Sequence, residues 1–446
     1  MKKYIFVIVV LICFNVKAQN NYTGYHSDAF LLQSGSNPSA IPEANFVIGF
    51  PGLSNGSFGL EWPLSLNEVL VKGVDDSLRA SLPFINSNLE SQNTLLFGAH
   101  NQLFHLGFKV GAEKKVFAYV GSEIVADVGF QFSDDLIDYL SNGNAKFLNQ
   151  QVNLRDEKFE TSVYHSLYLG TAVDVNEKLN VGLRIKLLTG LANVHTDHMD
   201  IGMYTDSNST PIYATTLSAD LLIQTSGRGA MDDTLEFDPL LNSGFAFDLG
   251  ASYQYNEKLG FSFALNDLGS ITWDEQNNEY YTTEGEVSYV FEGLTQSSAG
   301  AENLQEQMEE IVDSLTTTMQ PTTKTGTYTT QLSPNLYLGA NYKLTDKHQF
   351  SFLFHNTKKL DRAYNALSLG YQFNLAKSLQ LLASYQNVRG MNNLGAGFVW
   401  SPGPVQMHMI LDNTLSADVF DAKNFYLQFG ISLRYGHNKQ MASKED

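Results

Sequence analysis

The sequence lacks several features that would assign it to common classes of protein. Its one cysteine, Cys13, lies in an apolar run near the start of the chain, so we expect no disulfide bond in the rest of the protein. Basic residues are few: 28 Lys and Arg against 47 Asp and Glu give a net charge of -19, which argues against nucleic acid as a partner. Beyond the first 20 residues no apolar run reaches about 18 residues, so the sequence offers no transmembrane helix.

Motifs of common catalytic sites do not indicate an enzymatic activity. The chain contains no phosphate-binding loop of the G-x-x-x-x-G-K-[ST] type. A hydrolase built into a barrel wall would need a serine and a histidine on one face of its strands, but His165 and Ser166 are adjacent and point to opposite faces. The sequence therefore predicts no catalytic residues, no enzymatic activity and no cofactor.

The first residues have the pattern of a secretory signal. Two lysines precede an apolar run that ends near Phe14, and "KAQ" supplies a cleavage region near Ala18 or Gln19. The run is too short to span a bilayer as a helix. We therefore predict a signal peptide over residues 1–19.

What the sequence has in quantity is alternation of apolar and polar residues. In "NFYLQFGISLRYG", residues 424–436, successive side chains of an extended chain point to opposite faces. One face carries Phe425, Leu427, Phe429, Ile431, Leu433 and Tyr435. The other face carries Tyr426, Gln428, Gly430, Ser432, Arg434 and Gly436. Such a strand separates an apolar from a polar environment.

The same alternation recurs at 104–110, 181–188, 245–255 and 367–373. The polar face is rich in glycine and serine, and aromatic residues on the apolar face lie towards the strand ends. This pattern is typical of an outer-membrane barrel, which has a lipid-facing apolar band and a polar lumen. The predicted fold is all-β, a closed antiparallel transmembrane barrel in which every backbone group is paired.

The spacing of turns predicts the number of strands. If short turns are periplasmic and long loops extracellular, strand directions alternate without a misfit through about 14 strands, and both termini lie in the periplasm. This count requires that 211–225 and 279–291 lie outside the wall; roughly 12 or 16 strands are the alternatives. The expected location is the outer membrane of a Gram-negative bacterium. The short turns are at 111–115, 175–180, 255–260, 344–349, 374–379 and 401–406.

The mature chain divides into a lead-in at 20–45, a barrel at 46–436 and a polar tail at 437–446. Helical patterns predict three short helices, and the one at 301–319 is expected to pack over a loop or the barrel mouth, with a docking surface for a partner helix as the alternative. They occur at 134–151, in part of 67–92 and at 301–319. Extracellular excursions are expected at about 63–100, 131–158, 191–242 and 274–326.

Glycines and prolines exclude a long regular element before the first strand. Two interpretations are open, a simple periplasmic lead-in or a plug that folds back into the lumen. The plug residues would be Asn37, Pro38, Pro42, Gly49, Pro51 and Gly52. Residues expected to line the lumen, and there to contact a solute or to pair with one another, are Arg184, Lys186, Asp248 and Arg434.

The densest cluster of polar side chains is "HTDHMD", with His195, Asp197, His198 and Asp200. Zinc binds histidines and carboxylates in many sites. In a strand, however, His195 and Asp197 share one face while the other two residues take the opposite face, so the four do not converge without a turn. We expect polar residues that enter an extracellular loop, and no metal site.

Four stretches together carry a resemblance to a known family. They are "NPSAIPEANFVIGFPGLSNGSFGL" (37–60), "HLGFKVG" (105–111), "NEKLNVGLRIKLLTGLANVHT" (176–196) and "NFYLQFGISLRYG" (424–436). They are similar to an outer-membrane barrel family of Bacteroidota whose function is unknown. That family in turn resembles the FadL-like barrels, a group that includes long-chain fatty-acid transporters and the PorV-type shuttle protein of type IX secretion. The resemblance implies a barrel of about 14 strands with an N-terminal plug-like segment.

Two functions are open for such a barrel. The first is a FadL-like conduit or binder for a hydrophobic or amphipathic solute. The second is a non-enzymatic accessory or scaffold subunit, whose loops at 191–242 and 274–326 dock other outer-membrane proteins or periplasmic lipoproteins in secretion or outer-membrane protein assembly. In both cases the barrel contacts outer-membrane lipid.

Overall fold

The computed structural model describes most of the chain. The predictions for residues 1–19, 301–319 and 437–446 lie outside the described residues. Those are 22–72, 78–80, 82–155, 157–209, 214–227, 241–274, 278–283, 287–291, 322–413 and 423–436.

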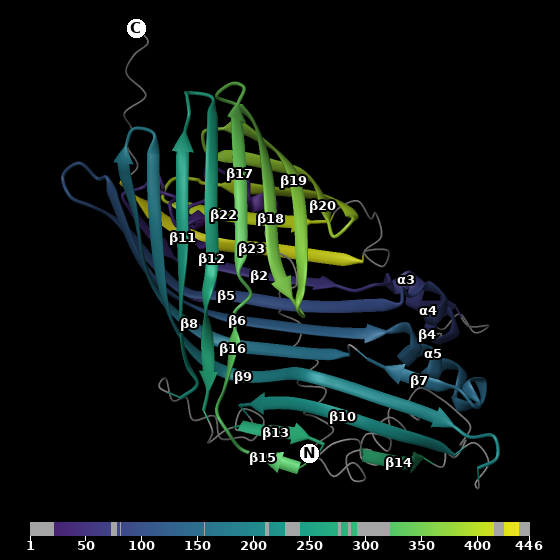
Figure 1. The fold of residues 1–446 in the computed structure, drawn as a ribbon. Helices are drawn as coiled ribbons and strands as arrows, with labels where there is room; N and C mark the ends of the chain where they lie inside the picture. Colours follow the sequence, from purple (N-terminus) through teal and green to yellow (C-terminus); the bar gives the residue numbers. More distant parts are fainter. Residues whose placement is uncertain are drawn as a thin grey trace.

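The wall is a closed antiparallel barrel of fourteen strands (Figure 1). Its first strand consists of two pieces, β1 (Phe46–Gly49) and β2 (Asn55–Glu61). Both pieces pair with β5 (Gln92–Val110) on one side and with the last strand, β23 (Asn424–Tyr435), on the other, which closes the barrel. The predicted closure, antiparallel order and strand number are confirmed.

The other wall strands follow in chain order. One of them again consists of two pieces, because both β16 (Tyr328–Gln331) and β17 (Asn335–Lys343) pair with β12. The rest are β6 (Val116–Ser133), β8 (Lys158–Asn176), β9 (Leu179–Thr205), β11 (Ser243–Gln254), β12 (Leu259–Trp273), β18 (His348–Lys359), β19 (Arg362–Ala376), β20 (Leu379–Val388), β21 (Met391–Trp400) and β22 (Val405–Asp412).

Beyond the wall, the far half of β9 continues the same sheet into further strands, here named the outer sheet. It pairs with β7 (Gln151–Leu154) on one side and with β10 (Thr215–Ser226) on the other. β10 in turn pairs with β13 (Asn278–Thr282) and β14 (Val287–Phe291), and β13 pairs with β15 (Thr322–Lys324). The described parts of 211–225 and 279–291 therefore lie outside the wall, as the strand count requires.

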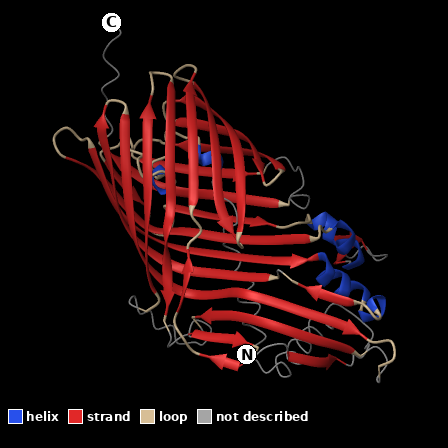
Figure 2. Cartoon of the chain, in the orientation of Figure 1, coloured by secondary structure: helices blue, strands red, loops and turns tan. Residues whose placement is uncertain are grey.

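Short helices gather at the end of the barrel opposite to the short turns (Figure 2). The predicted helix at 134–151 is shorter than expected, because Gly143 adopts a φ of 70° and ends it. No helix in the described ranges is long and apolar enough to cross a membrane. The elements here are α3 (Leu66–Val69), α4 (Leu82–Asn88), α5 (Asp134–Asn142), η2 (Asn144–Phe147) and the hairpin of β3 (Leu70–Lys72) and β4 (Leu78–Ala80).

The short turns have a local cause in the sequence. The motif "NEKL" occurs twice, at 176–179 and 256–259. In each copy the Asn side-chain oxygen accepts hydrogen bonds from the backbone N–H groups of the Lys and Leu, at 2.9 to 3.1 Å. This Asx-type turn reverses the chain tightly and fixes the register of the hairpin.

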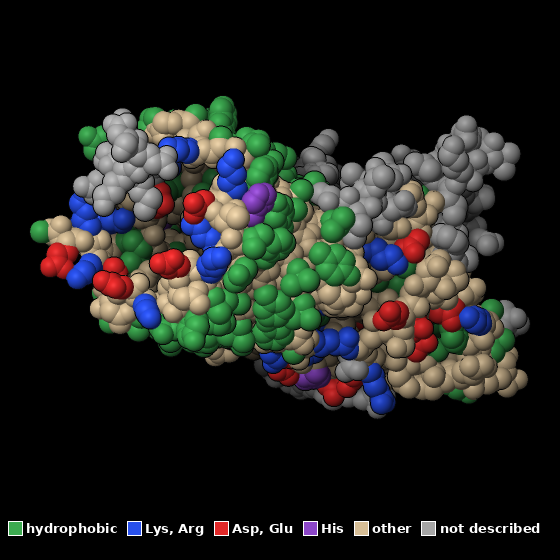
Figure 3. All heavy atoms as spheres, turned by 90° about the horizontal axis from the view of Figure 1, so that it is seen from above, with side chains coloured by type: hydrophobic (Ala, Val, Ile, Leu, Met, Phe, Trp, Pro, Cys, Tyr) green, Lys and Arg blue, Asp and Glu red, His purple; other side chains and the backbone are tan. Residues whose placement is uncertain are grey.

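The two faces of the wall strands meet different surroundings. In β9, Leu183 and Leu187 are 39% and 57% exposed, whereas Arg184 and Lys186 are 4% and 3% exposed. Figure 3 looks onto the end with the short turns and shows hydrophobic side chains on the outside and charged side chains around that end. Such an apolar outer surface requires a lipid environment, so the barrel is a membrane protein.

Aromatic residues mark the end of the apolar band near the short turns. Tyr255, Tyr342, Trp400 and Tyr435 lie within the last residues of strands or in the turns and are 57%, 44%, 42% and 80% exposed. Their amphipathic rings suit the boundary between hydrocarbon and head groups. The predicted aromatic enrichment at strand ends is therefore present on the outer face.

The core lies inside the barrel. Residues 22–45, here named the inner segment, run within the lumen and contain α2 (Tyr22–Tyr25) and η1 (Gln33–Gly35). Phe30 and Leu31 of this segment belong to one buried cluster with Phe117 and Tyr168 of the wall.

Glycines on the inner face of the wall make room for the inner segment. A Cβ placed on Gly182 would overlap the backbone of Pro38, and one on Gly395 would overlap the Thr23 hydroxyl. Gly250 and Gly370 are crowded in the same way by other residues of the segment. The glycine-rich polar face of the strands thus serves close packing as well as polarity.

Candidate functional site in the lumen

The inner segment is fastened to the wall by polar contacts along its length. At its start the Tyr22 N–H donates to Asp412 at 3.2 Å. In its middle the Leu31 N–H donates to Gln406 Oε1 at 2.9 Å. Near its end, the Ser39 and Ser252 hydroxyls lie 2.7 Å apart. Asp412 and Gln406 belong to β22, whereas Ser252 belongs to β11. Because these two strands are far apart in the order of the wall, the segment crosses the lumen rather than following one strand.

Two cavities lie on opposite sides of the inner segment. The large cavity, of about 970 Å³, is lined by strand residues towards the long loops and by Tyr22, Phe30 and Leu32 of the segment. The small cavity, of about 280 Å³, is lined by residues near the short turns and by another part of the segment, including His26 and Asp28. The segment therefore separates the two ends of the lumen.

A charged cluster forms part of the floor of the large cavity. Arg184 on β9 and Asp248 on β11 are direct cross-strand partners and form an ion pair. Lys186 lies 3.0 Å from Asp248 and 2.5 Å from Asp267 on β12. Arg184 also donates to the Gly35 carbonyl at 3.1 Å. The sequence predicted Arg184, Lys186 and Asp248 as lumen residues that contact a solute or pair with one another, but it did not predict which pairs form.

A β-bulge in β12 turns two adjacent polar side chains towards the cavity. The register with β11 shifts at this point, and Asp267 has a φ of 64°, an uncommon conformation for a residue other than glycine. Asn266 donates to the Ser36 carbonyl at 2.8 Å. Sequence reasoning missed both residues, although two consecutive polar residues in an alternating strand are the signal of a bulge.

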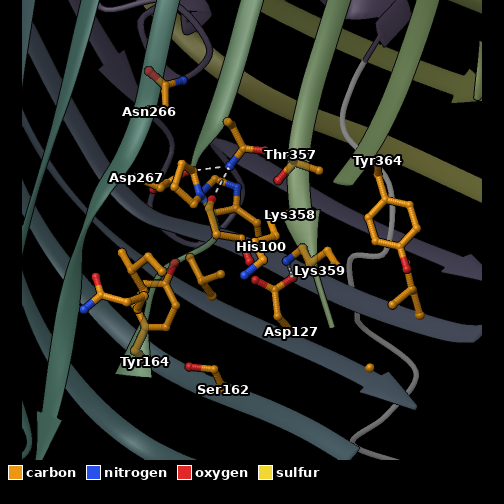
Figure 4. A pocket seen from close by; sticks show the side chains of 18 of the residues that line it. His100, Asp127, Ser162, Tyr164, Asn266, Asp267, Thr357, Lys358, Lys359 and Tyr364 are labelled. Atoms are coloured by element: carbon orange, nitrogen blue, oxygen red, sulfur yellow. Dashed lines mark hydrogen bonds and ion pairs between the residues drawn. The ribbon is translucent and has the colours of Figure 1, made fainter. Parts of the chain in front are cut away.

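A second polar group lines the large cavity from β5 and β6. His100 lies 2.6 Å from Glu123, and Gln102 donates to the Tyr168 hydroxyl at 2.7 Å. Figure 4 shows His100 among residues of several strands that surround the cavity, including Asn266, Asp267 and Tyr164. The lining therefore combines charged, amide and aromatic groups.

The tip of the β18–β19 hairpin reaches across the cavity to the opposite wall. Lys359 forms an ion pair with Asp127 of β6 at 3.0 Å (Figure 4). Asp361 pairs with Lys158 of β8. Leu360 between them is 3% exposed and packs on Leu96 of β5. The hairpin thus bounds the cavity on the side away from the inner segment.

The predicted plug residues fall into two groups. Asn37 and Pro38 belong to the inner segment, where the Asn37 amide donates to Ser252 at 3.4 Å, and Pro42 lies near its end. Gly49, the last residue of β1, and Pro51 and Gly52, in the break between β1 and β2, belong to the wall itself.

The predicted lumen residue Arg434 lies apart from the charged cluster. It stands at the short-turn end of β23, where its guanidinium donates to the Ser401 and Gly403 carbonyls, each at 3.1 Å.

The "HTDHMD" stretch lies in β9. His195 is 3.7 Å from Glu160. His198 contacts Asp197 at 3.0 Å and Asp220 of β10 at 3.4 Å. Within the described ranges, no group of three or more His, Cys, Asp or Glu residues is arranged to hold a metal ion.

Two serines have features of hydrolase sites. The Ser122 hydroxyl lies 2.6 Å from His165 Nε2, on the outer face of β6 and β8. Ser54 stands in a G-x-S-x-G spacing at 52–56, but in the break between the wall strands β1 and β2 rather than in the strand-turn-helix of a nucleophile elbow. Its hydroxyl donates to the Gln102 carbonyl at 3.0 Å. Sequence reasoning missed the Ser122–His165 pair because its members come from different strands.

One family model matches most of the chain, over residues 38–412, and its description is a family of unknown function (DUF5723). The chain belongs to this family. Membership agrees with the resemblance seen in the sequence and assigns no activity. No curated protein matches the chain in sequence.

Several solved structures are similar to this chain in outline. The Ralstonia pickettii toluene transporter TbuX has 9% sequence identity and a TM-score of 0.43, with 90% of this chain and 93% of that chain covered. A Pseudomonas aeruginosa FadL homologue has 10% identity and a TM-score of 0.45, with 95% and 100% covered. The P. putida toluene transporter TodX has 7% identity and a TM-score of 0.42, with 90% and 94% covered. Likeness at this level does not extend the solutes of those proteins to this chain.

Proposed function

We propose that this protein is an outer-membrane conduit that binds an amphipathic solute in the large cavity and releases it past the inner segment. The observation that carries the proposal is the cavity of about 970 Å³ between the hairpin tip and the inner segment. Its volume is within the range of small-molecule sites, which combine apolar walls with a few placed polar groups. We propose that the barrel is oriented with its short turns, and with the first and last wall strands' outer ends beside them, towards the periplasm.

The composition of the lining favours an amphipathic solute over a pure hydrocarbon. Phe30, Leu32 and Leu96 offer apolar surface, whereas Glu123 and Asp267 offer charge in the same space. A hydrocarbon would leave these polar groups without compensation for lost water. A molecule with a polar head and an apolar tail satisfies both kinds of lining.

The inner segment acts as the plug in this proposal. It separates the two cavities, and up to Ala44 it is held to the wall by hydrogen bonds, one guanidinium contact and apolar packing rather than by sheet pairing. Displacing it exchanges these contacts for water without breaking the wall. Passage of a solute therefore requires a shift of the segment, while the barrel stays closed.

A reversible cross-link tests this function. Ser39 and Ser252 have hydroxyls 2.7 Å apart, so the double variant Ser39→Cys, Ser252→Cys is suited to a disulfide that locks the segment to β11. The purified variant is placed in proteoliposomes, and influx of labelled octyltrimethylammonium, octyl sulfonate and octyl glucoside is measured. We expect wild type to admit at least one of them, and the oxidised variant to admit it only after reduction.

The single variant Ser252→Cys is the matched control and is expected to behave as wild type under both conditions. Influx that continues unchanged through the oxidised double variant contradicts the role of the segment as a plug. Absence of both binding and influx for every solute in wild-type protein contradicts the conduit itself.

The accessory-subunit alternative is supported by the outer sheet. A conduit through the wall does not require β7, β10 and the far half of β9. These strands form a buried cluster of their own, which includes Phe147 and Met203. In that case a protein partner would remain bound through gentle purification, and removal of residues 206–214 between β9 and β10 would release it. In neither case do we propose an enzyme, since the Ser122–His165 pair lies outside the lumen.

A further inference from the structure

Asn266 Oδ1 is a polar atom of the large cavity whose role the fold does not explain. Asn266 is 4% exposed, and its Oδ1 has no hydrogen-bond partner, although the residue lines the cavity. The orientation of its amide is fixed, because Nδ2 donates to the Ser36 carbonyl at 2.8 Å and the opposite orientation would bring two oxygens together. A buried acceptor left open towards a cavity calls for a donor from the solute.

The charges around Asn266 Oδ1 favour a donor that is positively charged. Two carboxylates, Asp267 and Glu123, line the cavity floor together with two permanent cations, Arg184 and Lys186. A third carboxylate, Asp248, is buried behind them and pairs with both cations. While His100 beside Glu123 is neutral, these groups carry one negative charge more than the two cations balance. A further cation at this place is attracted, and an anion is repelled.

The neighbouring uncharged groups also favour a cation that donates hydrogen bonds. The Gln102 side chain is 4% exposed, and its Oε1 also lacks a partner on the cavity lining. Tyr164 and Tyr337 bring aromatic rings to the same cavity, and aromatic faces attract cations. His100, bonded to Glu123 at 2.6 Å, carries positive charge only when it is protonated.

We infer that the polar head of the solute is a protonated amine, which donates hydrogen bonds to Asn266 Oδ1 and lies near Asp267, while its apolar tail lies against Leu96 and Phe30. This inference rests on the proposed function and specifies its substrate class. The bulge in β12 forms this site, because it turns the side chains of two adjacent acceptors, Asn266 and Asp267, towards the same cavity.

Titration calorimetry with octylammonium and octanoate tests the inference at pH 7, on the protein in lipid nanodiscs with empty nanodiscs subtracted. We expect octylammonium to bind at least about tenfold more tightly than octanoate, the ratio expected from one hydrogen bond to a charged group. Equal or tighter binding of octanoate overturns the amine inference and leaves the conduit standing. If neither probe binds, the inference and the proposed function fail together.

Two variants at one position separate head-group binding from the fastening of the inner segment. Asn266→Leu and Asn266→Asp both lose the donation to the Ser36 carbonyl. Only the second keeps an acceptor and adds negative charge. We expect Asn266→Leu to weaken octylammonium binding about tenfold and Asn266→Asp to strengthen it. The same shift in both variants would contradict the inference, because it would report only on the segment.

A third variant is a matched control. Asn393 is also a buried asparagine of the wall, 3% exposed, with an unpartnered side-chain atom, but it is not among the residues that line either cavity. Asn393→Leu should leave the affinity for octylammonium unchanged. A loss equal to that of Asn266→Leu would mean that any buried polar change in the wall alters binding, which overturns the assignment to Asn266.

Discussion

The outer and inner faces of the same strands follow different physical rules. On the outer face of β19, Leu367 and Leu369 are 48% and 59% exposed, and each meets lipid without a specific partner. On the inner face, Ser368 is 1% exposed and bonds to His26 of the inner segment at 2.8 Å. The outer face needs only apolar character, which many residues supply. The inner face needs particular partners, so single changes there have particular consequences.

The largest effect is expected from breaking the charged cluster. Asp248→Ala leaves Arg184 and Lys186 buried with only part of their compensation, which we expect to lower the free energy of unfolding by about 3–5 kcal/mol. The measurement is urea unfolding in detergent micelles, followed by tryptophan fluorescence. Asp346→Ala is the control, since that side chain is 95% exposed and its removal should be nearly neutral. A loss below about 1 kcal/mol would contradict this, because it would show that water compensates the charges of Arg184 and Lys186 when Asp248 is absent.

A charge placed on the outer face should lower the free energy of unfolding somewhat less, by an amount that depends on its depth in the membrane. Leu369→Arg places a guanidinium in the apolar band, and we expect a loss of about 2–4 kcal/mol in the same unfolding measurement. Tyr435→Arg at the short-turn boundary should cost only about 0–1 kcal/mol, because the side chain reaches water. Equal losses at both positions would contradict the depth of the lipid band assigned to the outer face.

Crowding the inner face should displace the inner segment and spare the wall. A side chain at Gly182 overlaps the backbone of Pro38, so Gly182→Val should cost about 1–3 kcal/mol. It should also make residues 22–45 accessible to protease in the folded barrel. Gly56→Ala is the control, since its Cβ would meet only the Phe429 ring, at 3.3 Å. Protection of the segment in Gly182→Val would argue against its close packing on β9.

The smallest effect is expected where the inner face opens to water at the hairpin tip. Hydrogen bonds from Lys158 and Lys358 lower the pKa of Asp361 to about 2. A lowered folded-state pKa contributes stability above the unfolded pKa of about 4, and this contribution is lost as the pH falls towards 2. Since the side chain is 56% exposed, Asp361→Asn should cost at most about 1 kcal/mol at pH 7.

Comparing the urea midpoints of wild type and Asp361→Asn between pH 5 and 2 checks this prediction. The difference between them should shrink as the pH falls. A difference that grows towards low pH has the wrong sign and would contradict the ion pairs at the hairpin tip.

The wall was predictable from the sequence because its signals are local. Alternation has a period of two residues, so one stretch such as 424–436 already assigns each side chain to lipid or lumen. The "NEKL" turns are local as well, since each Asn bonds to its own turn. Strand direction and number then follow from the lengths of the connections.

The tertiary structure alone decided which inner-face residues meet. Arg184 and Asp248 are 64 residues apart in sequence and become partners only because β9 and β11 are neighbours in the wall. Asn266 faces the cavity because a bulge interrupts the alternation, and Gly182 lies beneath Pro38 because the inner segment folds back across the lumen. The sequence by itself determined the barrel and the character of its two faces. Closure of the barrel around the inner segment determined the contacts, because they join strands whose separation along the chain carries no local signal.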